Sequence, residues 1–318
     1  MPALDRVLSL LPEVVREAFE DETVSELMIN GPGKYFVERG GGQPVEVEAP
    51  GLTAEDIYAA AIHIARPLGL EAGEKVPIVD ARLDDGSRVA IALPPVVQYA
   101  AITIRRFGGR QFSAEDLIEQ GSLPRPVYEE AIEHLRERRN VLIAGGTGSG
   151  KTTLLQALAG VIPEDERILV IEDTTEIQLE AKNLLQMEAR DLAGSGLSIR
   201  DLVKASLRHR PDRLILGEVR GAEAADLIQA LNTGHGGSLS TIHSNDAESA
   251  LVRLASCALQ GGEGISWPVL CMQVAQAIDF VIHVERRDGR RVVSSAVRVL
   301  GAQGDGWETR RFWPLAGR

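Results

Sequence analysis

The feature that most constrains this chain is the segment NVLIAGGTGSGKTTLLQAL, residues 140–158. An apolar run typical of a buried strand leads into a glycine-rich loop, and a helical pattern follows. Gly145, Gly150, Lys151 and Thr152 have the spacing Gly-x-x-x-x-Gly-Lys-Thr of a phosphate-binding loop. This pattern is meaningful only between a strand and a helix, which is its context here. A chance glycine-rich turn would not combine all eight positions with that context, so we expect a P-loop in an α/β domain.

The residue types in this loop have separate roles in binding phosphate. Glycines allow backbone N–H groups to turn inward onto phosphate oxygens, and the following helix adds its positive N-terminal end. The Lys151 ammonium would reach the β- and γ-phosphates, and the Thr152 hydroxyl would be a ligand of Mg²⁺. ATP and Mg²⁺ are therefore the expected cofactors. The nucleotide-binding residues expected from the loop are Gly145, Gly146, Thr147, Gly148, Ser149, Gly150, Lys151, Thr152 and Thr153.

The rest of the chain divides into two expected domains. Residues 1–109 alternate short strand and helix patterns, which predicts a small α+β domain. Gly108-Gly109 interrupts these patterns, and a capping box at 113–116 begins a new helix. Residues 110–318 contain short apolar strands separated by helical stretches, which predicts a mostly parallel sheet covered on both faces. Asp288-Gly289 predicts an antiparallel hairpin near the end. The expected fold class is α/β.

Charge and composition exclude several classes of protein. The formal net charge is −12 over 318 residues, and only 4% of the residues are aromatic. Neither a basic track nor a stacking platform for nucleic acid is therefore expected. No apolar run is long enough to span a membrane. Cys257 and Cys271 do not form a CxxC pair, which argues against structural zinc and a disulfide framework and favours a reducing cytoplasm.

Two acidic segments are candidates for holding the metal and activating the water in a hydrolase. In RLILGEVRG, residues 213–221, Gly217 stands where such strands usually end in an Asp, and Glu218 follows. In VIEDTTEI, residues 170–177, acids follow another apolar strand. Acids just past the carboxyl ends of parallel strands gather where ligands bind. The alternative for each acid is a solvated loop carboxylate or a helix cap.

Four segments together resemble the traffic ATPases of bacterial type II and type IV secretion, conjugation and pilus machines. They are GGTGSGKTT, VIEDTTEI, LRHRPDRLILGEVRG and NTGHGGSLSTIHSND. In that family they are the Walker A motif, the Asp box, an atypical Walker B motif and the His box, in the same order. The resemblance extends from about Arg66 to about Val284 and favours the conjugation, type IV secretion and Tad-pilus branch. It implies a RecA-like P-loop ATPase domain preceded by a smaller α+β domain.

The resemblance also implies roles for individual residues. Glu176 would be the base that activates water, and Glu218 would hold Mg²⁺ and water. Glu172 and Asp173 would orient the metal shell, so that the metal set is Thr152, Glu172, Asp173 and Glu218. His235 and His243 would couple the γ-phosphate to neighbouring segments. The alternative for either histidine is an ordinary surface or core residue.

Arginines of the first domain resemble those that reach the nucleotide in this family, where it lies between the domains. Arg88 is one, and either Arg105 or Arg106 is the other. Adjacent residues on a strand point to opposite faces, so only one of the pair can take part, and we favour Arg105. Arginines near the Walker B motif are either subunit-interface groups or ordinary surface residues. These are Arg208, Arg210 and Arg220.

Three functions are consistent with these patterns. The first is a hexameric cytoplasmic ATPase that powers a type IV secretion, conjugation or pilus assembly machine and associates peripherally with the inner membrane through its partner proteins. The second is a nucleotide-gated assembly module with negligible turnover, which a phosphate-release assay would distinguish. The third is a RecA-type nucleic-acid translocase, which the net charge disfavours. The arginine-rich segment 285–291 either touches anionic lipid or is simply solvated.

Overall fold

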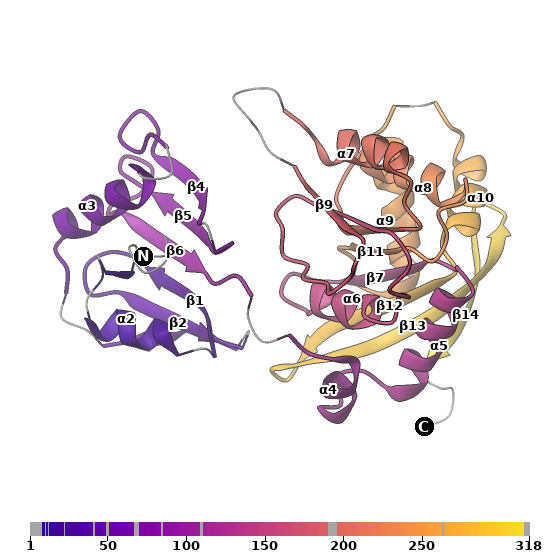
Figure 1. Cartoon of the computed structure of the whole chain (residues 1–318), viewed down its shortest axis with the longest axis horizontal. Coiled ribbons are helices and arrows are strands. Elements are labelled where there is room, and N and C mark those ends of the chain that lie inside the picture. Colours follow the sequence, from indigo (N-terminus) through magenta and orange to yellow (C-terminus); the bar gives the residue numbers. More distant parts are fainter. Residues whose placement is uncertain are drawn as a thin grey trace. The chain divides into compact units, whose positions relative to one another are not determined.

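The computed structural model describes residues 8–314 except 10, 12, 22, 41, 49–50, 67–69, 84, 109–110, 190–195 and 263. The chain divides into two compact units, Met1–Gln111 and Phe112–Arg318 (Figure 1). This division lies two residues beyond the boundary expected between 109 and 110, which itself falls outside the described residues. The capping box predicted at 113–116 is present, because Ser113 and Asp116 exchange hydrogen bonds at the start of α4, Ala114–Glu119.

The described part of the first unit is a six-stranded antiparallel sheet with two helices, an α+β arrangement as predicted. The strand order is β3-β2-β1-β6-β5-β4. Side chains alternate across each strand, so residues such as Leu27, Ile91 and Ile104 are buried and pack in one core with Ile57 of α3. The elements are α2 Glu13–Glu20, β1 Val24–Ile29, β2 Tyr35–Arg39, β3 Val45–Val47, α3 Ala54–Ala65, β4 Ile78–Arg82, β5 Arg88–Ala92 and β6 Ala101–Arg105.

The second unit is built on an eight-stranded sheet, as far as its described residues go, in the order β14-β13-β12-β7-β11-β10-β8-β9. The six strands from β12 to β9 are parallel to their neighbours, and β13 and β14 extend one edge as antiparallel strands. The strands are β7 Val141–Gly145, β8 Ile168–Glu172, β9 Leu184–Glu188, β10 Arg213–Val219, β11 Leu239–Ile242, β12 Phe280–Arg287, β13 Arg290–Gln303 and β14 Gly306–Trp313.

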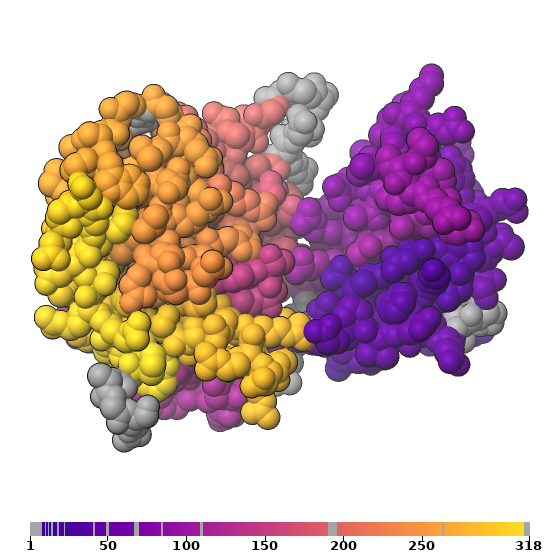
Figure 2. Space-filling view, turned by 180° about the vertical axis from the view of Figure 1, so that it is seen from behind, coloured from indigo at the N-terminus to yellow at the C-terminus, as the bar shows by residue number. Residues whose placement is uncertain are grey.

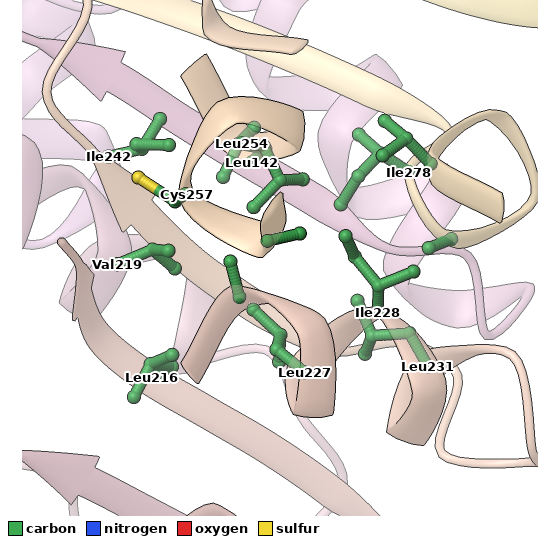
Figure 3. Close-up of a cluster of buried hydrophobic side chains, with 14 of the residues drawn as sticks. Leu142, Leu216, Val219, Leu227, Ile228, Leu231, Ile242, Leu254, Cys257 and Ile278 are labelled. Atoms are coloured by element: carbon green, nitrogen blue, oxygen red, sulfur yellow. The ribbon is translucent and has the colours of Figure 1, made fainter. Parts of the chain in front are cut away.

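Helices cover both faces of this sheet, which explains why its strands read as continuous apolar runs. One face packs against α4, α5 and α6, and the opposite face against α7, α8, α9 and α10. Figure 3 shows the second face, where Leu216 and Val219 of β10 meet Leu227 of α8 and Cys257 of α9. The remaining helices are α5 Arg125–Arg136, α6 Lys151–Ala159, α7 Ile199–Ser206, the 3₁₀ helix η2 Leu207–His209, α8 Glu223–Leu231, α9 Ala247–Leu259 and α10 Trp267–Ala277.

The predicted α/β class and the smaller α+β first domain are thus confirmed. The hairpin predicted at Asp288-Gly289 is the turn between β12 and β13. In Figure 2 the yellow C-terminal strands lie at the surface of the second unit. Among the described helices, none is long and apolar enough to cross a membrane.

Candidate nucleotide site

The phosphate loop connects the end of β7 at Gly145 to the start of α6 at Lys151. Gly148 and Gly150 have φ angles of 67° and 96°, in the left-handed region that favours glycine. A Cβ at Gly145 would lie 2.2 Å from the carbonyl oxygen of Val284, so this glycine is required for close packing against β12. A Cβ at Gly146 or Gly148 would meet nothing within 4 Å. The loop is therefore packed at its base and open along its exposed side, as a phosphate cradle requires.

Lys151 is buried inside this loop, with 8% of its surface exposed. Its Nζ donates hydrogen bonds to the carbonyl oxygens of Gly145 at 3.1 Å and Gly146 at 2.9 Å. Burial lowers the pKa of Lys151, and the charge of Glu218 opposes that shift. The ammonium predicted to contact phosphates is therefore held at the loop by carbonyls.

The predicted acids meet the loop because parallel strands end at one edge of the sheet. β8 ends at Glu172, β10 carries Glu218, and His243 follows β11. β10 does not end at Gly217, the position where such strands usually end in an Asp. It continues to Val219 with an irregular register after Leu216, and such a bulge re-aims a side chain. Glu218 consequently projects from within a strand rather than from a loop.

Glu218 lies at the centre of a charged cluster. Its Oε2 accepts hydrogen bonds from Arg220 Nη2 at 2.7 Å and Arg220 Nε at 2.9 Å. Its Oε1 lies 2.5 Å from His243 Nε2, but the two are not aligned as a hydrogen bond. In the described part of the chain this buried oxygen has no hydrogen-bond partner. Burial and the nearby Lys151 charge lower the pKa of His243, so its ring is neutral at physiological pH. An orphaned carboxylate oxygen is well suited to a metal-bound water.

Arg220 connects this cluster to the Asp box. Its Nη1 donates to Asp173 Oδ2 at 3.1 Å while its other nitrogens hold Glu218. Of the three Walker B arginines left open by the sequence, Arg220 is thus the one placed at the acids. Arg208 and Arg210 are exposed and precede β10, at the opposite edge of the sheet.

Glu172 is hydrogen bonded to the backbone of the Asp box. Its side chain is buried, and its Oε1 accepts hydrogen bonds from the backbone nitrogens of Glu176 at 2.9 Å and Ile177 at 3.0 Å. Burial raises the pKa of Glu172 to about 7, although these two hydrogen bonds lower it. In this structure Glu172 supports the backbone of Glu176, and its expected role in orienting the metal shell stays a prediction.

The space that Glu172 occupies explains the missing aspartate. A Cβ added at Gly217 would lie 2.9 Å from Glu172 Cγ, closer than such atoms pack. Any side chain at 217 would therefore displace a buried carboxylate that holds the Asp box. Gly217 leaves the space that the Glu172 side chain fills. The acid of the Walker B strand is therefore Glu218, one position later.

We predict that restoring the aspartate damages the protein. Gly217→Asp should lower the free energy of unfolding by about 1–3 kcal/mol, the usual cost of overpacking a core, and should also lower ATP turnover because the Asp box moves. The control is Gly301→Asp in β13, where an added Cβ meets nothing within 4 Å. Urea unfolding of both variants measures the difference. Equal stability of the two variants would contradict this explanation.

The structure does not bring His235 to the phosphate loop. His235 precedes β11, so it lies at the edge of the sheet opposite to His243, and its Nδ1 is 3.0 Å from the carbonyl oxygen of Ala230. The glycines that follow His235 are required by close packing. A Cβ at Gly237 would fall 1.4 Å from Nη1 of Arg213, whose buried guanidinium pairs with Glu166. This half of the His box therefore supports the strand edge, whereas His243 belongs to the site.

Arg105 and Arg106 lie on opposite faces of the sheet in the first unit. Arg105 is paired in register with Arg88 on one side and Glu26 on the other, so the three share one face of the sheet. Arg106 points to the other face, donates to the carbonyl oxygen of Phe19, and lies 4.5 Å from the centroid of the Phe19 ring. Arg106 is therefore part of the fold, and Arg105 is the one that shares a face with Arg88.

The residues present fit Mg²⁺ held mainly by phosphate. No group of three or more His, Cys, Asp or Glu side chains among the described residues could hold a metal ion alone. Mg²⁺ is typically bound by one or two carboxylates together with substrate phosphates. Asp173 and Glu218, which share the guanidinium of Arg220, are two carboxylates of the kind that such a shell uses.

Sequence reasoning missed Arg291. Its Nε donates to the carbonyl oxygen of Gly148 at 3.1 Å, although 143 positions separate the two residues. The sequence showed only an arginine-rich hairpin tip, and no local pattern indicated that this tip lies on the phosphate loop.

Comparisons with known proteins agree with this site. Residues 13–296 match the model of the family described as type II/IV secretion system protein. The chain is 34% identical to the conjugal transfer protein TrbB of Rhizobium radiobacter, over 93% of this chain and 90% of that protein. It is 32% identical to the type IV secretion system protein PtlH of Bordetella pertussis, over 86% of this chain and 89% of that protein.

Solved structures show the same fold at lower identity. The Legionella pneumophila ATPase DotB has a TM-score of 0.64 and 20% identity over 93% of this chain and 80% of that one. The pilus retraction motor PilT with bound ADP has a TM-score of 0.64 and 19% identity over 89% of this chain and 82% of that one. The four sequence motifs, the fold that brings residues of each motif to one edge of the sheet, and these matches together show that the chain belongs to the type II/IV secretion system protein family.

Proposed function

We propose that this secretion-family ATPase is the ATP-hydrolysing motor of a bacterial type IV secretion, conjugation or pilus assembly machine. The observation that carries the proposal is the meeting of Lys151, Glu176 and Glu218 at one edge of the sheet. Lys151 is electrostatically coupled to both glutamates. In this proposal Lys151 would be the phosphate-binding cation, Glu176 the base and Glu218 the metal-directing acid, even though the Walker B strand lacks an aspartate. The names of the relatives, in conjugal transfer and type IV secretion, support the kind of machine.

In this proposal each side chain has one role in hydrolysis. The loop N–H groups and Lys151 bind the β- and γ-phosphates, and Glu176 accepts the proton of the attacking water. Thr152, Asp173 and Glu218 would hold Mg²⁺, partly through water, and the ion would neutralise charge on the phosphates. Arg220 is hydrogen bonded to both Glu218 and Asp173, so these bonds would have to break before both acids could be ligands of the metal. Arg88 and Arg105 would stabilise the negative charge of the transition state.

The assembly is part of the same proposal. We place the protein in the cytoplasm as a homo-oligomer, most simply a hexamer, associated with the inner membrane only through proteins of the machine. ATP binding and hydrolysis would change the shape of the ring and so do work on those partners. Direct binding of nucleic acid is not proposed, because the net charge of −12 opposes a polyanion.

Two measurements on one preparation test this function against an assembly module without turnover. We expect steady phosphate release from Mg·ATP, and a larger mass in solution with a non-hydrolysable ATP analogue than without nucleotide. Lys151→Ala should lose both responses, because its ammonium is the group that reaches the phosphates. Lys182→Ala is the control, since Lys182 forms an exposed pair with Glu164. Analogue-driven assembly without phosphate release would instead support the assembly module.

A further inference from the structure

The β12–β13 hairpin contacts the phosphate loop at both ends of the loop. At the start of the loop, Val284 of β12 is paired in register with Gly145. At its end, the Cδ of Arg291 would lie only 3.1 Å from a Cβ built on Gly150. Between these points, Arg291 Nε donates to the carbonyl oxygen of Gly148. In Figure 1 this hairpin, in gold and yellow, extends beyond the ends of the neighbouring strands.

The hydrogen bond to Gly148 fixes the direction of a peptide group in the loop. A trans peptide is planar, so its carbonyl and N–H bonds point to opposite sides. Arg291 holds the carbonyl of Gly148 toward the hairpin, and the N–H of Ser149 must therefore point into the loop. The Ser149 N–H donates a long hydrogen bond of 3.4 Å to the carbonyl oxygen of Gly146 across the loop, and a phosphate oxygen would replace that acceptor. Inward N–H groups are what a P-loop offers to phosphate oxygens.

The hairpin can hold this position because it is fastened elsewhere in the fold. Past Arg291, the buried Val293 donates its N–H to the carbonyl oxygen of Ser122 at 2.9 Å, in the turn before α5. β12 itself is paired with β7 from Phe280 to Val284. Arg291 therefore contacts the phosphate loop from a strand that is hydrogen bonded to other parts of the domain, which is the arrangement that keeps a binding group oriented.

We propose that Arg291 is a positioning residue for nucleotide binding, which holds the Gly148–Ser149 peptide with its N–H directed at the phosphates. This inference rests on the proposed function only in that a nucleotide occupies the P-loop. Arg291 acts through the loop and not on the reacting atoms. Its loss should weaken nucleotide affinity much more than it slows the chemical step.

The test uses the full chain and a fluorescent ADP with Mg²⁺ as the probe. Arg291→Met keeps the aliphatic stem against Gly150 and removes only the donor group. We expect it to raise the Kd about tenfold, the scale of losing one hydrogen bond from a charged donor. Arg290→Met is the matched control, because Arg290 is an exposed neighbour of the same charge at the tip of the hairpin. It should bind like the parent protein.

Further readouts separate positioning from general damage. Without nucleotide, the melting temperature of Arg291→Met should stay close to that of the parent, because the lost hydrogen bond is exposed to solvent, and in turnover assays KM should rise while kcat changes little. An unchanged Kd in Arg291→Met, or an equal rise in Arg290→Met, would overturn the inference but leave the proposed function standing. A parent protein that does not bind the probe would overturn both.

Discussion

Glu176→Gln is expected to bind ATP with near-normal affinity and to hydrolyse it about 10²–10⁴-fold more slowly, the range typical of losing a general base. The amide keeps the shape of the side chain but cannot accept the proton of water. The backbone of Glu176 should stay in place, because Glu172 holds its N–H at 2.9 Å whatever the side chain is. Single-turnover hydrolysis measures this loss, and Glu180→Gln, an exposed acid further along the same segment, is the control.

Glu218→Gln should change both the rate of hydrolysis and its dependence on Mg²⁺. The amide loses the charge that the metal shell needs, and it also weakens the two hydrogen bonds that hold Arg220. We expect a lower rate together with a higher Mg²⁺ requirement. Because both glutamates act on one water and metal unit, the double variant should lose much less than the product of the two single losses. A Mg²⁺ titration of all three variants provides the comparison.

One result would reverse the two roles. If Glu176→Gln kept most of its rate and Glu218→Gln lost nearly all of it, Glu218 would be the base. The Asp box would then be a structural support for the site. The orphaned Oε1 of Glu218, near the neutral His243, would in that case be the atom that takes the proton.

Removing both arginines of the first unit should cost on the order of 10³-fold in single-turnover rate, the lower end of the range for arginines that stabilise a phosphoryl-transfer transition state. The variant is Arg88→Ala with Arg105→Ala. These residues are register partners, so one face of the sheet presents both cations. Loss of rate should exceed loss of affinity, because the charge they stabilise develops in the transition state.

Arg82→Ala is the matched control for this pair. Arg82 is the register partner of Arg88 on its other side, and its guanidinium lies 5.6 Å from the centroid of the Phe107 ring. Arg82→Ala therefore removes a cation from the same face of the sheet and leaves Arg88 and Arg105 unchanged. A double variant that hydrolyses ATP as fast as Arg82→Ala would exclude Arg88 and Arg105 from the chemistry.

The sequence by itself determined the architecture and the phosphate loop. Apolar runs separated by helical stretches predict a parallel sheet because both faces of such a sheet must be buried. The Gly-x-x-x-x-Gly-Lys-Thr spacing predicts the loop because both its geometry and its chemistry are local, within eight residues. The capping box at Ser113 is local in the same sense, and it is present.

Only the tertiary structure decided which distant residues share the site. Glu172 and Gly217 lie 45 positions apart, and their complementarity arises because β8 and β10 are adjacent strands. His235 and His243 are eight positions apart in one motif, yet the strand between them carries them to opposite edges of the sheet. Arg291 reaches Gly148 because β12 pairs with β7. Strand order is set by packing over the whole domain, so no local pattern encodes these contacts.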